Sequence, residues 1–164
     1  ALRMARAEAA HAGRRIRLAF DAEDGRAVVL WEAEPLAEPG VFTEYVGAPW
    51  TADVPTDLVR VVRSELTGPS AYELTAAEAR DGGDPGEPLD AITFYPDGSC
   101  DSAVIELRAV DAAEDDGRCV VAEMNGLTGV VRRHEFNTAE ARDEFYDQLA
   151  ARREEEAEDA WADE

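Results

Sequence analysis

The sequence predicts an α+β domain in which an N-terminal helix packs on antiparallel β-sheets and an extra C-terminal helix ends the chain. Three observations lead to this fold class. Small and apolar residues recur at helical spacing in residues 1–12, strand-like apolar segments recur between residues 14 and 134, and helical spacing returns in residues 137–150. The 164 residues are 45% hydrophobic, which is enough apolar material for one packed core.

The first twelve residues are mostly strong helix formers, with small or apolar side chains on one side of the helix at Leu2, Ala5, Ala9 and Ala12. Gly13 stands where a left-handed residue commonly ends a helix. No residue suited to an N-cap precedes the segment. We therefore expect residues 1–13 to be the end of a longer helix that begins upstream of Ala1.

A β-hairpin is expected over residues 14–31. Residues 15–20 alternate arginine or alanine with larger apolar side chains, which is the pattern of a strand with one buried face. Asp24-Gly25 is a tight-turn dipeptide, and residues 26–31 provide the second strand.

The middle of the chain gives weaker signals. Residues 32–56 contain four prolines and predict an irregular loop. Residues 58–66 fit both a strand and a helix, and their β-branched content favours the strand. Residues 72–80 predict a short helix, because a Thr and a Glu stand in capping-box spacing, and residues 81–88 predict a loop rich in turn residues.

The most regular part of the chain predicts four strands in one antiparallel meander. The strands are expected at residues 91–95, 103–108, 119–124 and 128–133. Short turns connect them, of which Pro96-Asp97-Gly98-Ser99 and Asn125-Gly126 carry the clearest turn residues.

The C-terminal helix is expected to begin with a capping box at residues 137–140, formed by Asn137 and Glu140. Ala141, Phe145 and Leu149 then give one apolar stripe to about residue 150. Beyond that residue the sequence is almost wholly charged, so we expect a frayed or disordered end.

The charge is strongly acidic and unevenly distributed. Thirty-seven acidic residues face sixteen basic ones, all arginines, for a net charge of −21. This balance opposes binding to nucleic acids and to anionic membrane surfaces. Residues 1–20 nevertheless carry a net +4, whereas residues 137–164 carry −8. No apolar run of 18 residues is present, so no segment of this sequence is expected to span a bilayer.

The chain offers no clear catalytic or metal-binding constellation. His11 and His134 are far apart and have no ligand-spaced partners, which disfavours zinc. No phosphate-binding loop or nucleophile elbow occurs, so we expect no catalytic residues and no cofactor. Asp97, Ser99 and Asp101 alternate as calcium ligands could, but the position that should hold an acid is Arg108, which favours a plain turn.

Cys100 and Cys119 are the two cysteines. An even number is compatible with one disulfide in an exported domain. A hairpin that turns at residues 111–117 would place Cys119 near Arg108 and several residues from Cys100, which favours free thiols. Both alternatives stay open from the sequence.

Three segments together resemble the soluble part of a minor pseudopilin of the type II secretion system, H-type, and its type IV pilin-like relatives. The matching residues are Leu2, Ala5, Arg6, Glu8, Ala9 and Gly13 in the helix, Ile92, Phe94, Pro96, Asp97, Gly98 and Ser99 around the turn, and Thr128, Gly129 and Val131 near the end. Val130 stands where that family usually has an arginine.

This resemblance implies a pilin-like domain over residues 1–134, followed by an acidic helical extension over residues 135–164 that has no counterpart in the family pattern. It implies a structural subunit near the tip of a secretion filament, assisting protein export, and not an enzyme. It also implies methylation, a place on the periplasmic side of the bacterial inner membrane, and an anchoring helix that this sequence lacks. Its expected partners are other pseudopilins and secretion-machinery proteins.

The resemblance assigns an assembly face to the N-terminal helix, at Leu2, Arg3, Ala5, Arg6 and Ala9. A simpler interpretation is that the small residues pack on the sheet of the same chain. A different class of function is an acidic binding module that recruits a basic partner through the C-terminal helix.

Overall fold

The computed structural model of the chain describes residues 1–21, 25–45, 50, 58–68, 89–113 and 116–162, with side chains of the last helix as far as Glu155. The elements of this described part are, in order, α1 (Leu2–Ala12), β1 (Ile16–Phe20), β2 (Ala27–Glu32), β3 (Phe42–Glu44), β4 (Val59–Leu66), β5 (Ile92–Phe94), β6 (Ala103–Ala109), β7 (Cys119–Met124), β8 (Val131–Phe136) and α2 (Ala139–Ala162). The α+β class expected from the sequence is confirmed.

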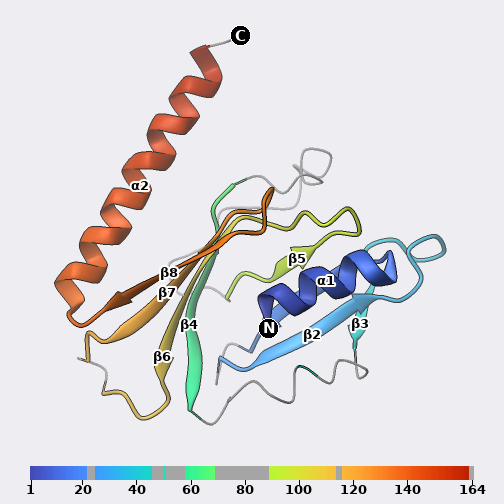
Figure 1. Cartoon of the computed structure of the whole chain (residues 1–164), viewed down its shortest axis with the longest axis horizontal. Helices are drawn as coiled ribbons and strands as arrows, with labels where there is room; N and C mark the ends of the chain where they lie inside the picture. Colours follow the sequence, from blue (N-terminus) through green and yellow to red (C-terminus); the bar gives the residue numbers. More distant parts are fainter. Residues whose placement is uncertain (22–24, 46–49, 51–57, 69–88, 114–115, 163–164) are drawn as a thin grey trace.

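The strands form two antiparallel sheets of four strands each. Sheet A has the order β3-β2-β1-β5, and sheet B has the order β4-β6-β7-β8. α1 lies along sheet A, and α2 projects from the body beside sheet B (Figure 1). Val61 of β4 donates its backbone N–H to Gly25 at the end of the first hairpin (3.3 Å), which joins the two sheets at one corner.

The main core lies between the two sheets and under α1. Its fully or nearly fully buried side chains include Ala5 and Ala9 from α1, Ile16, Leu18, Ile92 and Phe94 from sheet A, and Ile105 and Met124 from sheet B. Burial of this apolar surface is the main driving force that holds the sheets together.

Sheet B is covered on both faces. Ile105 of β6 points into the main core, whereas Val104 packs with Val121 and Leu149 in a second cluster beneath α2. Successive side chains of a strand point to opposite faces, so a strand buried on both sides shows no polar alternation. This explains why residues 103–106 are all buried.

The expected single meander is wrong, because β5 belongs to a different sheet from β6, β7 and β8. β5 pairs with β1, and after the turn only Phe94 and Cys100 bridge across it. The buried Asp101 then accepts a hydrogen bond from the Thr93 backbone N–H (2.7 Å), in place of continued strand pairing. The chain crosses to sheet B, where Cys100 donates its N–H to Gly126 (2.9 Å).

The structure confirms two of the other expectations, corrects one and does not describe the residues of another. The hairpin over residues 14–31 and the strand over residues 58–66 are confirmed. The loop expected over residues 32–56 contains the short strand β3, which pairs with β2. The helix expected over residues 72–80 lies outside the described residues.

The last hairpin has a longer loop than the Asn125-Gly126 dipeptide predicts. β8 begins at Val131 and not at residue 128, because Gly129 donates its N–H to the Asn125 carbonyl (2.7 Å) and closes a wide turn. The left-handed residue is Gly129, with φ 65°, and not Gly126. A side chain other than glycine would be strained there.

α2 begins one residue later and extends further than expected. Thr138 caps it, with its hydroxyl oxygen accepting from the Ala141 N–H (3.3 Å), in place of Asn137. The helix continues to Ala162, so the expected fraying beyond residue 150 is wrong. Residues 151–162 are rich in Ala, Arg and Glu and contain no Gly or Pro, which favours a helix even without an apolar face. Among the described helices, none is long and apolar enough to cross a membrane.

Candidate functional site

α1 uses its smallest side chains to approach sheet A. Ala5 and Ala9 are fully buried and α1 contacts β1 and β5. The residues of the expected assembly face therefore differ in their exposure to solvent. Ala5 and Ala9 are used inside the domain, Leu2 packs partly against the same core, Arg6 is half-buried, and Arg3 is exposed.

The solvent face of α1 presents Arg3, Met4, Ala7 and Ala10, with Met4 49% exposed. Within the described part of the chain, Arg3 forms no hydrogen bond or ion pair, so its charge is available to a partner. Gly13 ends the helix in the left-handed conformation, with φ 64°, as the sequence indicates.

Arg6 connects α1 to two loops that are remote in sequence. Its Nε donates to the carbonyl oxygen of Gly98, 92 positions away (2.5 Å). Its guanidinium also lies against Gly129, where an added Cβ would stand 2.1 Å from Arg6 Nη1. The three segments that carry the sequence resemblance, around Arg6, Gly98 and Gly129, thus meet at one side chain. Nothing in the local sequence pattern predicts this contact.

The turn after β5 is a closed set of internal hydrogen bonds. Asp97 Oδ1 accepts from the N–H (2.9 Å) and hydroxyl (2.7 Å) of Ser99, and these bonds lower the pKa of the Asp97 carboxyl, the hydroxyl bond most. The buried Asp101 accepts from the Thr93 N–H and from the Tyr95 hydroxyl (2.9 Å). The described residues contain no group of three His, Cys, Asp or Glu side chains placed to hold a metal ion. The expected absence of a cofactor stays a prediction.

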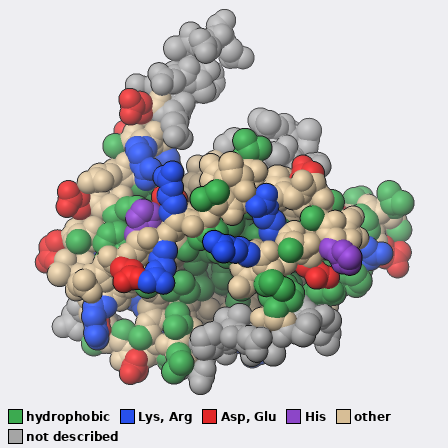
Figure 2. All heavy atoms as spheres, in the orientation of Figure 1, with side chains coloured by type: hydrophobic (Ala, Val, Ile, Leu, Met, Phe, Trp, Pro, Cys, Tyr) green, Lys and Arg blue, Asp and Glu red, His purple; other side chains and the backbone are tan. Residues whose placement is uncertain are grey.

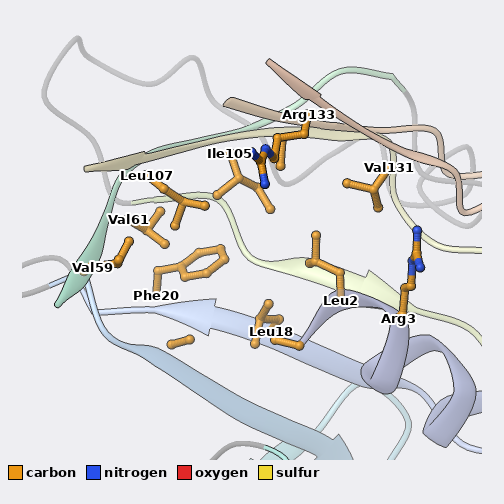
Figure 3. A pocket seen from close by; sticks show the side chains of 14 residues that line it. Leu2, Arg3, Leu18, Phe20, Val59, Val61, Ile105, Leu107, Val131 and Arg133 are labelled. Atoms are coloured by element: carbon orange, nitrogen blue, oxygen red, sulfur yellow. The ribbon is translucent and has the colours of Figure 1, made fainter. Parts of the chain in front are cut away.

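An apolar cavity of about 630 Å³ lies beside the first residues of α1, between the sheets. Leu2, Phe20, Ile105 and Leu107 point toward one another across it (Figure 3). Arg3 and Arg133 are the charged side chains in its lining. Figure 2 shows the corresponding face of the molecule, where arginine side chains border a hollow with hydrophobic side chains. Such a volume accommodates several apolar side chains or one small ligand.

The two cysteines are not brought together. Both are free and buried, Cys100 in the main core and Cys119 in the cluster beneath α2. Burial raises the pKa of the Cys100 thiol to about 11 and also raises the pKa of Cys119. The reactive thiolate is therefore scarce at neutral pH.

α2 is attached to sheet B through a buried carboxylate. Glu106 is 3% exposed, and it accepts from Tyr146 Oη (3.1 Å) and Arg108 Nε (2.8 Å). The Arg63 guanidinium lies over the Tyr146 ring, 4.0 Å from its centre. Burial, and then the charge of Glu106, raise the pKa of the Tyr146 hydroxyl, so it remains a donor at all ordinary pH values.

Sequence reasoning did not single out Glu106. The available signal was an acidic residue inside an otherwise apolar strand, since a buried carboxylate needs hydrogen-bond partners. Arg108 is two positions away in the same strand, but Tyr146 comes from α2, 40 positions away along the sequence.

No model of a known protein family matches this chain, and no curated protein matches it. Among solved structures, it is similar to the minor pseudopilin EpsH from the type II secretion system of Vibrio cholerae. One EpsH structure has a TM-score of 0.46 and 12% identity, over 81% of this chain and 87% of that one. Another has a TM-score of 0.47 and 14% identity, over 82% and 87%.

Proposed function

We propose that this chain is a structural, non-catalytic subunit of a type IV pilin-like filament, of the minor pseudopilin kind that serves type II secretion. The observation that carries the proposal is the position of Arg6, whose side chain joins α1 to the Gly98 turn and lies against the Gly129 loop. These are the three segments in which the sequence resembles that family. A residue pattern spread over the chain thus corresponds to one contact in space.

The finer proposal is an H-type subunit near the filament tip, on the periplasmic side of the inner membrane. An apolar helix upstream of Ala1 would anchor the subunit in the membrane. It would extend α1 at its N-terminal end, past the cavity lined by Leu2, Leu18 and Phe20. The apolar lining supports this arrangement, because it offers burial to the side chains of such a helix. Other pseudopilins and secretion-machinery proteins would contact the solvent face of α1.

Site-specific photocrosslinking tests the proposed contacts. A photoreactive amino acid at Ala7 or Ala10, both exposed on α1, is expected to crosslink to other pseudopilins in cells that assemble the filament. The matched control places it at Arg118, which is exposed on the β6–β7 connection, where no such product is expected. Absence of pseudopilin products from both α1 positions would contradict the proposal.

The coding sequence upstream of Ala1 provides an independent test of the anchor. We expect an apolar helix immediately upstream of Ala1, preceded by a short basic leader. A polar segment there would remove the membrane anchor from the proposal.

A second candidate function is an acidic docking helix for a basic partner. The observation that favours it is the length of α2, which continues to Ala162 while the cluster beneath α2 reaches only to Leu149. Replacing Glu154 and Glu155 by Gln should weaken salt-sensitive binding to such a partner, since exposed charges are screened at high salt. Binding that is unchanged by these substitutions would exclude this function.

A further inference from the structure

A second cavity lies where α2 passes the end of sheet B. Its volume is about 510 Å³, and its lining includes Arg132 of β8 and both Arg152 and Arg153 of α2. Ser102 and Asn125 line it as well, from the start of β6 and the β7–β8 loop. Three arginines from two elements therefore face one polar space.

The charge of this cavity is positive in a chain whose net charge is −21. Glu123 is the acidic residue in the lining, and it is already engaged. Its carboxylate lies 3.2 Å from His134 Nε2 and 3.6 Å from Arg152 Nη1. Within the described residues, Arg132 forms no ion pair or hydrogen bond. The cavity thus holds more cationic charge than its own carboxylate balances.

Arg153 is also incompletely paired. Its Nη1 approaches Glu65 only to 4.0 Å, and its Nε and Nη2 are buried without a hydrogen-bond partner in the described structure. A buried guanidinium nitrogen that lacks an acceptor is unfavourable. A small shift of the side chain toward an anion in the cavity would supply that acceptor.

Two further polar side chains of the lining, Asn125 and Ser102, have donors that the described structure leaves available. Asn125 Oδ1 already accepts from the N–H and the hydroxyl of Thr128, both at 2.9 Å, which leaves the amide nitrogen of Asn125 to donate. Ser102 Oγ accepts from the Gly126 N–H (2.8 Å), which leaves its own proton to donate. An occupant that satisfies these groups must be rich in acceptors.

We propose that this cavity binds a phosphate group, either of a small phosphate ester or of a lipid headgroup. Guanidinium groups form paired hydrogen bonds to phosphate oxygens, and the combined donors of Arg132, Arg153, Asn125 and Ser102 exceed what the two oxygens of one carboxylate accept. The site exists only because α2 lies against sheet B, so it gives the appended helix a role. It does not depend on the proposed function in a filament.

The test is a titration of the full chain with inorganic phosphate and with glycerol 3-phosphate, at constant ionic strength, followed by backbone amide NMR. The expected result is a saturable change of the Gly126 and Thr128 signals. Arg132→Met should weaken binding about tenfold, as loss of a charge-assisted hydrogen bond does, and Arg132→Lys should recover part of it. Because Arg132 is exposed, its replacement leaves folding intact, which the spectrum itself verifies.

The matched control is Arg118→Met, since Arg118 is an arginine on the opposite end of sheet B, with its side chain 74% exposed. It should leave binding unchanged. Equal weakening by Arg118→Met and Arg132→Met would identify an adventitious ion only and would overturn the proposal, as would the absence of any saturable change.

Vesicles distinguish the two sources of the phosphate. If a lipid supplies it, the chain should float with phosphatidylglycerol vesicles but not with phosphatidylcholine vesicles, and Arg132→Met should abolish flotation. If a soluble ester supplies it, glycerol 3-phosphate should bind and neither vesicle should. Flotation that survives Arg132→Met would place any lipid contact elsewhere and would contradict a lipid in this cavity.

Discussion

Arg6 links α1 to the turn at Gly98, which is 92 positions away in sequence. Its guanidinium also lies so close to residue 129 that only a glycine there leaves it room. Gly129 provides that room, because a Cβ atom at residue 129 would overlap the Arg6 guanidinium. The backbone of Gly129 is also left-handed, with φ 65°. Residue 129 must therefore be a glycine for two reasons, its left-handed backbone and its contact with Arg6. Substitutions can measure separately how much each reason contributes to stability.

Replacement of Gly129 by Ala should destabilise the domain more than replacement of Gly13 by Ala. Both glycines have almost the same φ, 65° and 64°, so both substitutions introduce backbone strain of about 1–2 kcal/mol. Only at Gly129 does the new Cβ meet another side chain. We expect an additional cost of about 1 kcal/mol there, measured by urea unfolding, from this overpacking.

The additional cost should disappear when Arg6 is replaced by Met, because the obstructing guanidinium is then gone. A double-mutant cycle measures this coupling directly. Equal effects of the Gly13 and Gly129 substitutions would show that Arg6 does not occupy the space beside Gly129.

Glu32 should make the stability of the domain depend on acid pH. It is 1% exposed, and it accepts from Arg15 Nε (2.7 Å) and from the Gly40 N–H (2.7 Å). The hydrogen bond from Arg15 is the largest of the causes that lower the pKa of Glu32 below its ordinary value of 4.5. Since the folded-state pKa is the lower one, the ionised carboxylate stabilises the fold above pH 4.5, and this contribution is lost as the pH falls through the folded-state pKa.

The measurement is the unfolding free energy from pH 7 to pH 3. Glu32→Gln should reduce stability at pH 7 and flatten the loss below pH 4.5 relative to the unmodified chain. Glu34→Gln, at a neighbouring exposed acid, should leave the profile nearly unchanged. Parallel profiles for Glu32→Gln and the unmodified chain would contradict this role of Glu32.

At the scale of elements, α2 depends on few buried contacts. Leu149 is 6% exposed and packs on Val104 and Val121 in the cluster beneath α2. Leu149→Ala should cost about 2–4 kcal/mol if α2 stays in place, which exceeds what most surface contacts contribute. We therefore expect α2 to detach in this variant while the sheets remain folded.

Hydrogen exchange distinguishes detachment from general unfolding. Amides of residues 139–155 should exchange faster in Leu149→Ala, while those of β1 and β2 keep their protection. Gln148→Ala, which alters the exposed neighbour, should leave both regions unchanged. Uniform loss of protection in Leu149→Ala would indicate that α2 and the sheets unfold together.

Elements with a strong local pattern are those that the sequence predicts. The alternation in residues 15–20 and the helix formers of residues 1–12 correspond to β1 and α1. The sheet to which β5 belongs has no local signal, because it is determined by the buried Asp101 and by pairing with β1, 74 or more positions earlier. β3 has three residues, too few for a period to be recognised.

The candidate site shows the same limit. The small residues of α1 and the turn at residues 96–99 are recognisable because composition and turn chemistry are local. The contacts of Arg6, Glu106 and Arg153 are made across the fold, and a long side chain gives no indication in sequence of where its charge is placed. Sequence patterns thus identify α1 as a candidate for assembly contacts, but they do not show which face of the helix is exposed to solvent.

At the scale of the whole molecule, the excess of acidic residues opposes the compact folded state through electrostatic repulsion. Sixteen arginines cannot balance thirty-seven acidic residues, and some of them pair with buried carboxylates, as Arg15 does with Glu32 and Arg108 with Glu106. Most of the surplus acids therefore remain on the surface, where they repel one another. Exposed ion pairs such as Arg118 with Asp116 oppose this repulsion only weakly, because water and salt screen them.

Salt should consequently raise the melting temperature of the whole domain. Increasing NaCl from about 0.01 M to about 1 M shortens the screening length from about 30 Å to about 3 Å, which removes long-range repulsion but weakens exposed pairs. With a net charge of −21 the repulsion is the larger effect, and we expect a rise of about 3 °C, which corresponds to roughly 1 kcal/mol. Replacing Glu154, Glu155, Glu156 and Glu158 by Gln lowers the net charge to −17 and should reduce the rise. A melting temperature that falls with salt would mean that ion pairs, and not repulsion among surplus acids, dominate the electrostatic stability of this fold.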